Sequence, residues 1–228
     1  MKKLFVIVFL FCFKQGSAQS PASGIWISPQ IMLNLNKKWQ WYNDGGYRTI
    51  GTSVSAYQTL YRTGVKYFIS DKWSITAGFA LFYTRTNYEK TNHEFGGEFR
   101  LWQEVNYKWK VSKRFNIQNR FRPEERFFNA TNNKSAFDAI RIRNKLSGTL
   151  MFSEKWGMQL SDEFMQQYDH SHFWFNQNRL IASAVYQSNK TTQVQAGYLW
   201  FIRPDYNQHI ITVTIQKTFS LHAHEKHN

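Results

Sequence analysis

The sequence predicts an all-β fold: a single antiparallel transmembrane β-barrel of about 10–12 strands, with short periplasmic turns and longer extracellular loops. Three observations predict it. Apolar and polar residues alternate along most of the chain, short polar turns alternate with longer connections, and tryptophans gather at segment ends. Each is typical of a barrel in which one face of every strand meets lipid.

The first element is a secretory signal peptide at residues 1–18. It has a basic start, an apolar run over Leu4–Phe13 that is too short for a transmembrane helix, and small residues before an expected cleavage after Ala18. Cys12 is the only cysteine, so the cleaved protein would hold no disulfide. We expect residues 19–219 to form the barrel domain.

The strand segments are recognised by their period of two residues. In 136–152, Ile140 and Ile142 share one face, and Arg141 and Arg143 share the other. A soluble sheet would bury the isoleucines, whereas a transmembrane barrel turns them to lipid and the arginines to the lumen. Similar alternation occurs at 73–83, 94–109, 115–127, 194–201 and 209–219.

The connections follow a regular order along the chain. Short polar links carrying lysine lie at 35–39, 70–73, 111–115, 153–156 and 188–191. Longer connections are expected around 44–52, 85–93, 128–135, 166–173 and 202–207. The short turns pair ten segments, and 208–219 makes an eleventh. If both termini are periplasmic the strand number is even, so either 25–33 is not a wall strand or 53–69 contains an extra turn.

Tryptophans flank the turns and loops. A soluble barrel scatters tryptophans in a similar way, but positions beside turns favour the aromatic girdles at the two membrane interfaces. The isoleucines of 136–152 are therefore expected to face lipid. The tryptophans concerned are Trp39, Trp41, Trp73, Trp109, Trp156 and Trp200.

The formal net charge of +14 raises the question of an anionic partner. Export by the signal peptide argues against nucleic acid, and we predict no nucleic-acid partner. An exported protein meets outer-membrane lipids and the phosphates of lipopolysaccharide first, and arginines inside a lumen also add to the charge without binding anything. The predicted location is the cell outer membrane.

Five sequence blocks resemble a known family. They are "RFRPEERFF" (120–128), "RIRNKLSG" (141–148), "LSDEF" (160–164), "FNQNRLIASAVY" (175–186) and "VQAGYLW" (194–200). Together they resemble the DUF2490 family, exported proteins of bacteria such as Bacteroidetes. The resemblance implies an outer-membrane β-barrel of uncharacterised function in a Gram-negative bacterium, and it brings no catalytic residues.

The alternation sends a set of charged side chains into the lumen. A narrow barrel filled by paired charges predicts a structural or interaction role, which is the leading hypothesis. The alternative is an anion-preferring, porin-like channel for small anionic solutes. The sequence predicts no cofactor. The lumen set is Glu98, Arg100, Glu104, Arg120, Arg122, Glu124, Arg126, Arg141, Arg143, Lys145, Glu163 and Arg179.

A third hypothesis is an enzyme that modifies outer-membrane lipid, although no convincing catalytic motif occurs in the sequence. Its candidate bases are His93, His170, His172 and His209. Residues 168–173, "YDHSHF", contain the residue types of a hydrolase site, but adjacent residues cannot easily form a triad. We therefore predict a solvated extracellular loop there and no catalytic residue.

The chain ends in a histidine-containing tail at 220–228. Three histidines without a scaffold make a weak metal site, and we predict no metal role for them. Phe219 precedes the tail, and a terminal aromatic of this kind predicts contact with the outer-membrane assembly machinery.

Overall fold

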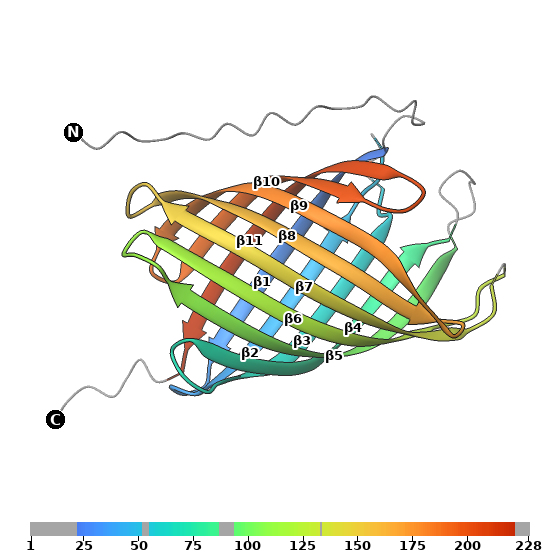
Figure 1. Cartoon of the computed structure of the whole chain (residues 1–228), viewed down its shortest axis with the longest axis horizontal. Helices are drawn as coiled ribbons and strands as arrows, with labels where there is room; N and C mark the ends of the chain where they lie inside the picture. Colours follow the sequence, from blue (N-terminus) through green and yellow to red (C-terminus); the bar gives the residue numbers. More distant parts are fainter. Residues whose placement is uncertain (1–21, 52–54, 87–93, 133, 222–228) are drawn as a thin grey trace.

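The computed structural model describes residues 22–51, 55–86, 94–132 and 134–221, and these residues form a closed barrel of eleven strands (Figure 1). The expected signal peptide, His93 and most of the histidine tail lie outside the described residues. Among the residues described, no helix is long and apolar enough to span a membrane. The strands are β1 (Ala22–Asn34), β2 (Trp39–Arg48), β3 (Gln58–Phe68), β4 (Trp73–Arg85), β5 (Phe95–Lys110), β6 (Phe115–Phe128), β7 (Phe137–Met151), β8 (Trp156–Asp169), β9 (His172–Asn189), β10 (Thr192–Ile202) and β11 (Asn207–Ser220).

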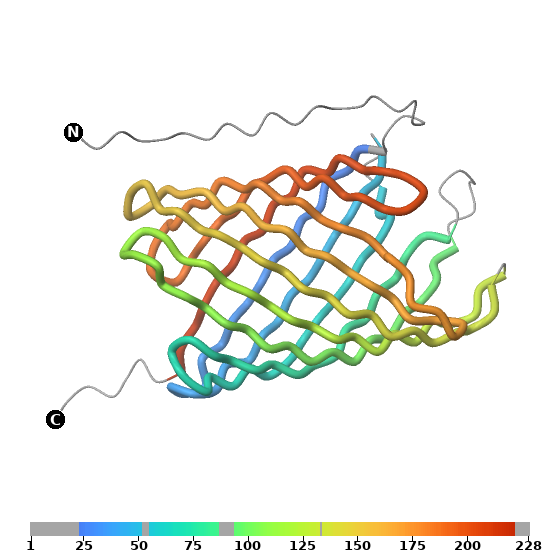
Figure 2. The backbone as a smooth tube through the Cα atoms, viewed as in Figure 1, coloured from blue at the N-terminus to red at the C-terminus, as the bar shows by residue number. Residues whose placement is uncertain are grey.

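Consecutive strands pair antiparallel, but β1 closes the barrel by pairing in parallel with β11. Figure 2 shows these two strands, one blue and one red, side by side. The register runs from Ala22 opposite Gln208 to Asn34 opposite Ser220. Parallel closure leaves no edge strand, and it does not require an even number of strands.

The expectation of an even strand number is therefore wrong, and so are the two ways of reaching one that the sequence offered. The segment 25–33 is a wall strand within β1, and the stretch 53–69 contains one described strand, β3, with no turn inside it. The expectation assumed that both termini lie at the same end of the barrel. With an odd number, β1 begins at one end and β11 finishes at the other.

Four of the five short links share one hydrogen-bonding pattern, which explains why their sequences look alike. The Ser70 hydroxyl accepts hydrogen bonds from the backbone N–H groups of the residues two and three positions further on. Ser112 and Ser153 do the same, and the Asn36 side-chain oxygen replaces the hydroxyl in the first link. A side-chain oxygen in this position satisfies turn donors that the sheet leaves unpaired.

Two of the five connections expected to be long are short. β8 and β9 extend to a two-residue turn at His170 and Ser171, whose φ angles are 46° and 68°. Two successive positive φ angles are typical of tight hairpin turns, because they match the twist of the flanking strands. β10 and β11 are joined by 203–206. Polar composition suggested longer loops here, but the flanking strands extend to within a few residues of each other.

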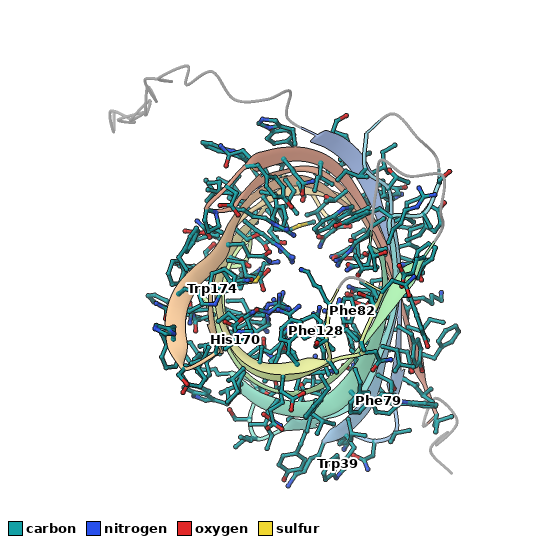
Figure 3. The ribbon with its side chains drawn as sticks, turned by 90° about the vertical axis from the view of Figure 1, so that its right-hand side faces the viewer. Trp39, Phe79, Phe82, Phe128, His170 and Trp174 are labelled. Carbon is teal, nitrogen blue, oxygen red and sulfur yellow. The ribbon has the colours of Figure 1, made fainter. Side chains whose placement is uncertain are left out.

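The apolar face of the barrel points outward. Ile140 is 46% exposed, whereas its neighbours Arg141 and Arg143 are buried inside. At the end with the short links, Trp39, Trp73 and Trp156 each lie against the tyrosine paired with them on the next strand, with ring centroids 4.6 to 4.7 Å apart. Figure 3 shows Trp39 on the outside of the barrel and Phe82 on the inside. This distribution is that of a lipid-facing wall with an aromatic girdle.

The parallel seam predicts that the two strand ends face opposite sides of the membrane. An epitope inserted immediately before Ala22 should be accessible on intact cells, and one inserted after Ser220 should be reached only after permeabilisation. Antibody labelling measures this. An epitope in the connection 129–136, at the same end as Ala22, is the control. Equal accessibility of the two terminal epitopes would contradict the eleven-strand barrel.

Candidate functional site in the barrel lumen

The inward face of strands β5 to β9 carries all twelve charged residues expected in the lumen. Because successive side chains of a strand alternate between faces, acidic and basic residues two positions apart point to the same side. Most of the twelve are buried. They are Glu98, Arg100 and Glu104 on β5; Arg120, Arg122, Glu124 and Arg126 on β6; Arg141, Arg143 and Lys145 on β7; Glu163 on β8; and Arg179 on β9.

Glu124 is the centre of one half of this group. Its carboxylate accepts from Arg141 Nε at 3.0 Å and from Arg143 Nη1 at 2.5 Å. Guanidinium nitrogens of Arg100 and Arg122 lie 3.5 and 3.9 Å from the same carboxylate. Four arginines therefore share one buried counterion.

Glu163 is the centre of the other half. It accepts from Arg143 Nη2 at 2.6 Å and from Arg120, and Arg179 Nη1 lies 3.6 Å away. Arg143 bridges Glu163 and Glu124.

Glu98 and Glu104 extend the network at its two ends. Glu98 pairs with Arg100 and Arg126, and Glu104 pairs with Arg122 and Arg120. One connected network thus holds seven arginines and four glutamates. Lys145 lies opposite Glu163 in the β7–β8 register, but it forms no salt bridge with a described carboxylate.

A second ion pair in the lumen was not expected from the sequence. Asp44 on β2 is 2% exposed, accepts a hydrogen bond from the Tyr42 hydroxyl at 2.6 Å, and forms a salt bridge with Arg62 on β3. The stretch "NDGG" around Asp44 resembled a turn, because Asn, Asp and Gly are typical turn residues. The alternation with Tyr42 was the signal that places Asp44 on the inner face.

Aromatic rings support the guanidiniums of the network. The guanidinium carbon of Arg100 lies 3.5 Å from the centroid of the Phe82 ring, and that of Arg122 lies 4.6 Å from Trp102. Trp102 fits against β3 because Gly64 has no side chain; a Cβ there would lie 2.9 Å from the indole. The rings hold the arginines by cation–π contact and limit their rotation.

Two cavities enter the lumen from opposite ends. The first, about 600 Å³, opens among the ends of the strands that carry the longer connections, and the second, about 490 Å³, lies toward the short links. Gln30 on β1 and Arg120 on β6 line both cavities, so these side chains lie where the two cavities approach each other.

The two cavities differ in chemistry. The first is rich in arginine and contains Arg48, Arg179 and Arg203 besides several members of the network. Tyr57, in the β2–β3 connection, lines it too, and burial raises the pKa of its hydroxyl. The second cavity has more amides in its lining, including Gln40, Asn106, Gln118, Gln159, Gln193, Gln195 and Gln216, and its cations include Lys66, Lys72 and Lys108.

Of the histidines considered as catalytic bases, the structure describes three, and His209 lies on a different strand from His170 and His172. His170 and His172 form the tip of the β8–β9 hairpin, where His170 lies 3.5 Å from Asp169 and the side chain of His170 is 77% exposed. His209 lies on β11 and contacts the Tyr198 hydroxyl. Over the described ranges, no group of three histidine, cysteine or acidic residues is arranged to hold a metal.

Comparison with known proteins supports the fold. One solved structure, described as "NanC porin structure in rhombohedral crystal form", matches 82% of this chain and 90% of its own with a TM-score of 0.53 at 9% identity. The search of curated proteins gave no match. The family described as "Protein of unknown function (DUF2490)" matches residues 23–208. Since this match spans most of the barrel, the chain belongs to the DUF2490 family.

Proposed function

We propose that the protein is an outer-membrane barrel whose lumen passes small anionic solutes. The observation that carries this proposal is the pair of cavities that enter from the two ends, with Gln30 and Arg120 lining both of them. The fold of the NanC porin, with which this chain shares its architecture, is compatible with such a role. A solute that crosses the barrel would have to pass between these two side chains, which favours small solutes.

The excess of arginine gives the path its preference for anions. The network contains seven arginines and only four glutamates, and each glutamate is engaged by at least two arginines. The inner wall formed by β10, β11 and β1 is neutral where it lines the cavities, with residues such as Gln195, Thr214 and Ser28. An anion would therefore pass between a cationic wall and a hydrogen-bonding wall.

A structural role is the second candidate. The ion pairs link β5, β6, β7, β8 and β9 across the interior, and such cross-links stiffen a barrel whether or not it conducts. In this case the network would act as a plug, and the barrel would serve structure or interaction.

Planar-bilayer recording tests the channel. Purified protein should give steady single-channel currents with anion preference, and Arg120→Gln should lower the anion-to-cation permeability ratio by roughly twofold or more, because it removes a positive charge that lines both cavities. Arg114→Gln, in the exposed link 111–114, removes the same charge away from both cavities and should leave the ratio unchanged. Absence of currents would support the plugged barrel and overturn the channel.

We also propose that the barrel contacts outer-membrane lipids, lipopolysaccharide and the outer-membrane assembly machinery. Cleavage of residues 1–18 and insertion by the outer-membrane assembly machinery would bring the apolar wall into contact with outer-membrane lipids and lipopolysaccharide. Phe219, 49% exposed near the end of β11, is the residue we propose for the assembly contact.

A further inference from the structure

Arginines and aromatic rings alternate along one side of the first cavity. The guanidinium carbon of Arg48 lies 4.0 Å from the Trp26 ring centroid, and that of Arg179 lies 5.1 Å from the same centroid. Arg179 also lies 5.0 Å from Phe201, and Arg203 lies 4.5 Å from Phe201. We call these five residues, Arg48, Trp26, Arg179, Phe201 and Arg203, the arginine ladder.

The topology of the barrel brings the ladder together. Trp26 is on β1, Arg48 on β2, Arg179 on β9 and Phe201 on β10, while Arg203 follows β10 directly. Trp26 and Phe201 meet edge to face across the parallel seam, with centroids 5.7 Å apart. The ladder therefore exists only because β1 closes against β11.

The ladder arginines differ from those of the glutamate network in their counterions. Arg48 donates to Gln58 and Arg203 donates to the Tyr206 hydroxyl, and neither forms a salt bridge with a described carboxylate. The Nε atoms of both are buried without a hydrogen-bond partner among the described residues. Arg179 has one carboxylate, Glu163, at 3.6 Å, and that carboxylate also serves Arg120 and Arg143.

Three positive charges thus line one cavity wall with little compensation. Rings on either side orient them and lower their cost of burial, but a ring is a weaker partner for a guanidinium than an anion. Uncompensated charge in a partly buried site favours binding of a counterion from solution.

We propose that the arginine ladder is a binding site for solutes that carry two oxyanion groups, phosphate or carboxylate. A guanidinium offers paired N–H donors that match an oxyanion better than a spherical halide. Because a ring separates each pair of neighbouring arginines, two oxyanion groups on one solute engage the ladder better than one. The inference rests on the proposed function for the route of the solute, since the ladder lies at the entrance to the path.

Calorimetric titration of the purified barrel in detergent tests the site. Pyrophosphate and succinate are the two-group probes, and inorganic phosphate and acetate are their one-group counterparts. At least one two-group probe should bind saturably, and about tenfold or more tightly than its counterpart. The probe that binds identifies the oxyanion. If neither two-group probe binds, or if each binds no better than its counterpart, the proposal is wrong.

Two variants locate the binding. The double variant Arg48→Gln/Arg203→Gln should weaken binding by about tenfold or more, whereas Arg114→Gln at the opposite end should leave it unchanged. Equal weakening in the two proteins would show a general charge effect and overturn the site. Heat-modifiable gel mobility checks that each variant is folded; if the double variant is unfolded, Arg48→Lys should fold and bind more weakly, and unchanged binding in Arg48→Lys would overturn the site.

The titration and the bilayer recording distinguish a failure of the proposed binding site from a failure of the proposed channel. If the barrel binds pyrophosphate but carries no current, the binding site is supported and the channel is overturned. If the barrel conducts anions but none of the probes binds saturably, the channel is supported and the binding site at the arginine ladder is overturned.

Discussion

Replacing Glu124 with glutamine is expected to lower the free energy of unfolding by about 3–5 kcal/mol, because it leaves four buried arginines without their shared counterion. The side chain of Glu124 is 3% exposed, so little water reaches this position to solvate the arginines that lose their counterion. A neutral amide still accepts a hydrogen bond but carries no compensating charge. Urea titration of the barrel in detergent, followed by tryptophan fluorescence, measures the effect.

Glu125→Gln is the matched control. Glu125 is the next residue of β6, but it points to the outer face and is exposed, so its substitution should change the unfolding free energy by no more than about 0.5 kcal/mol. Similar losses in both variants would contradict a stabilising network.

A double variant keeps this prediction testable if Glu124→Gln does not fold. Glu124→Gln/Arg141→Gln removes one charge of each sign, because Arg141 has Glu124 as its only salt-bridge partner in the described chain. Part of the lost stability should return. No recovery would show that the loss has another cause than the unpaired charge.

The faces of the strands were predictable from the sequence, because the two-residue period depends only on neighbours along the chain. The alternation of Ile140 with Arg141 is enough to assign β7, and the structure confirms an all-β barrel with the isoleucines outside. Composition misled at Asp44, because polar residues on an inner barrel face have the same composition as a loop. Around His170 it misled because β8 and β9 extend to a tight turn of two polar residues.

The partners of each charge were not predictable to the same degree. Arg120 on β6 reaches Glu163 on β8, past the intervening strand β7. Such contacts depend on the tilt of the strands and the curvature of the wall, which one sequence does not specify. The arginine ladder depends in addition on the parallel pairing of β1 with β11. The number of strands expected from the sequence did not determine which strands close the barrel or in which direction they pair.

Replacing Ile142 with arginine is expected to impair barrel assembly more than replacing Arg143 with glutamine. Ile142 lies on the outer face, where an arginine near the membrane midplane costs about 2–4 kcal/mol. Arg143→Gln breaks two ion pairs, but arginines outnumber glutamates in the network. Glu124 keeps Arg141 and Glu163 keeps Arg120 as partners. Loss of an arginine is therefore tolerated better than loss of a glutamate.

The yield of heat-modifiable barrel in the outer-membrane fraction measures this difference, and cysteine labelling tests its cause. A cysteine at position 142 should react with a lipid-soluble thiol reagent, whereas one at 143 should be protected or should react only with a water-soluble reagent. The parent chain, whose only cysteine is Cys12, is the control for background labelling. The reverse pattern would place the arginines outside and the isoleucines in a core, as in a soluble exported sheet. Such a sheet would have no lipid-facing wall, and Ile142→Arg would then be harmful because it buries a charge rather than because it meets lipid.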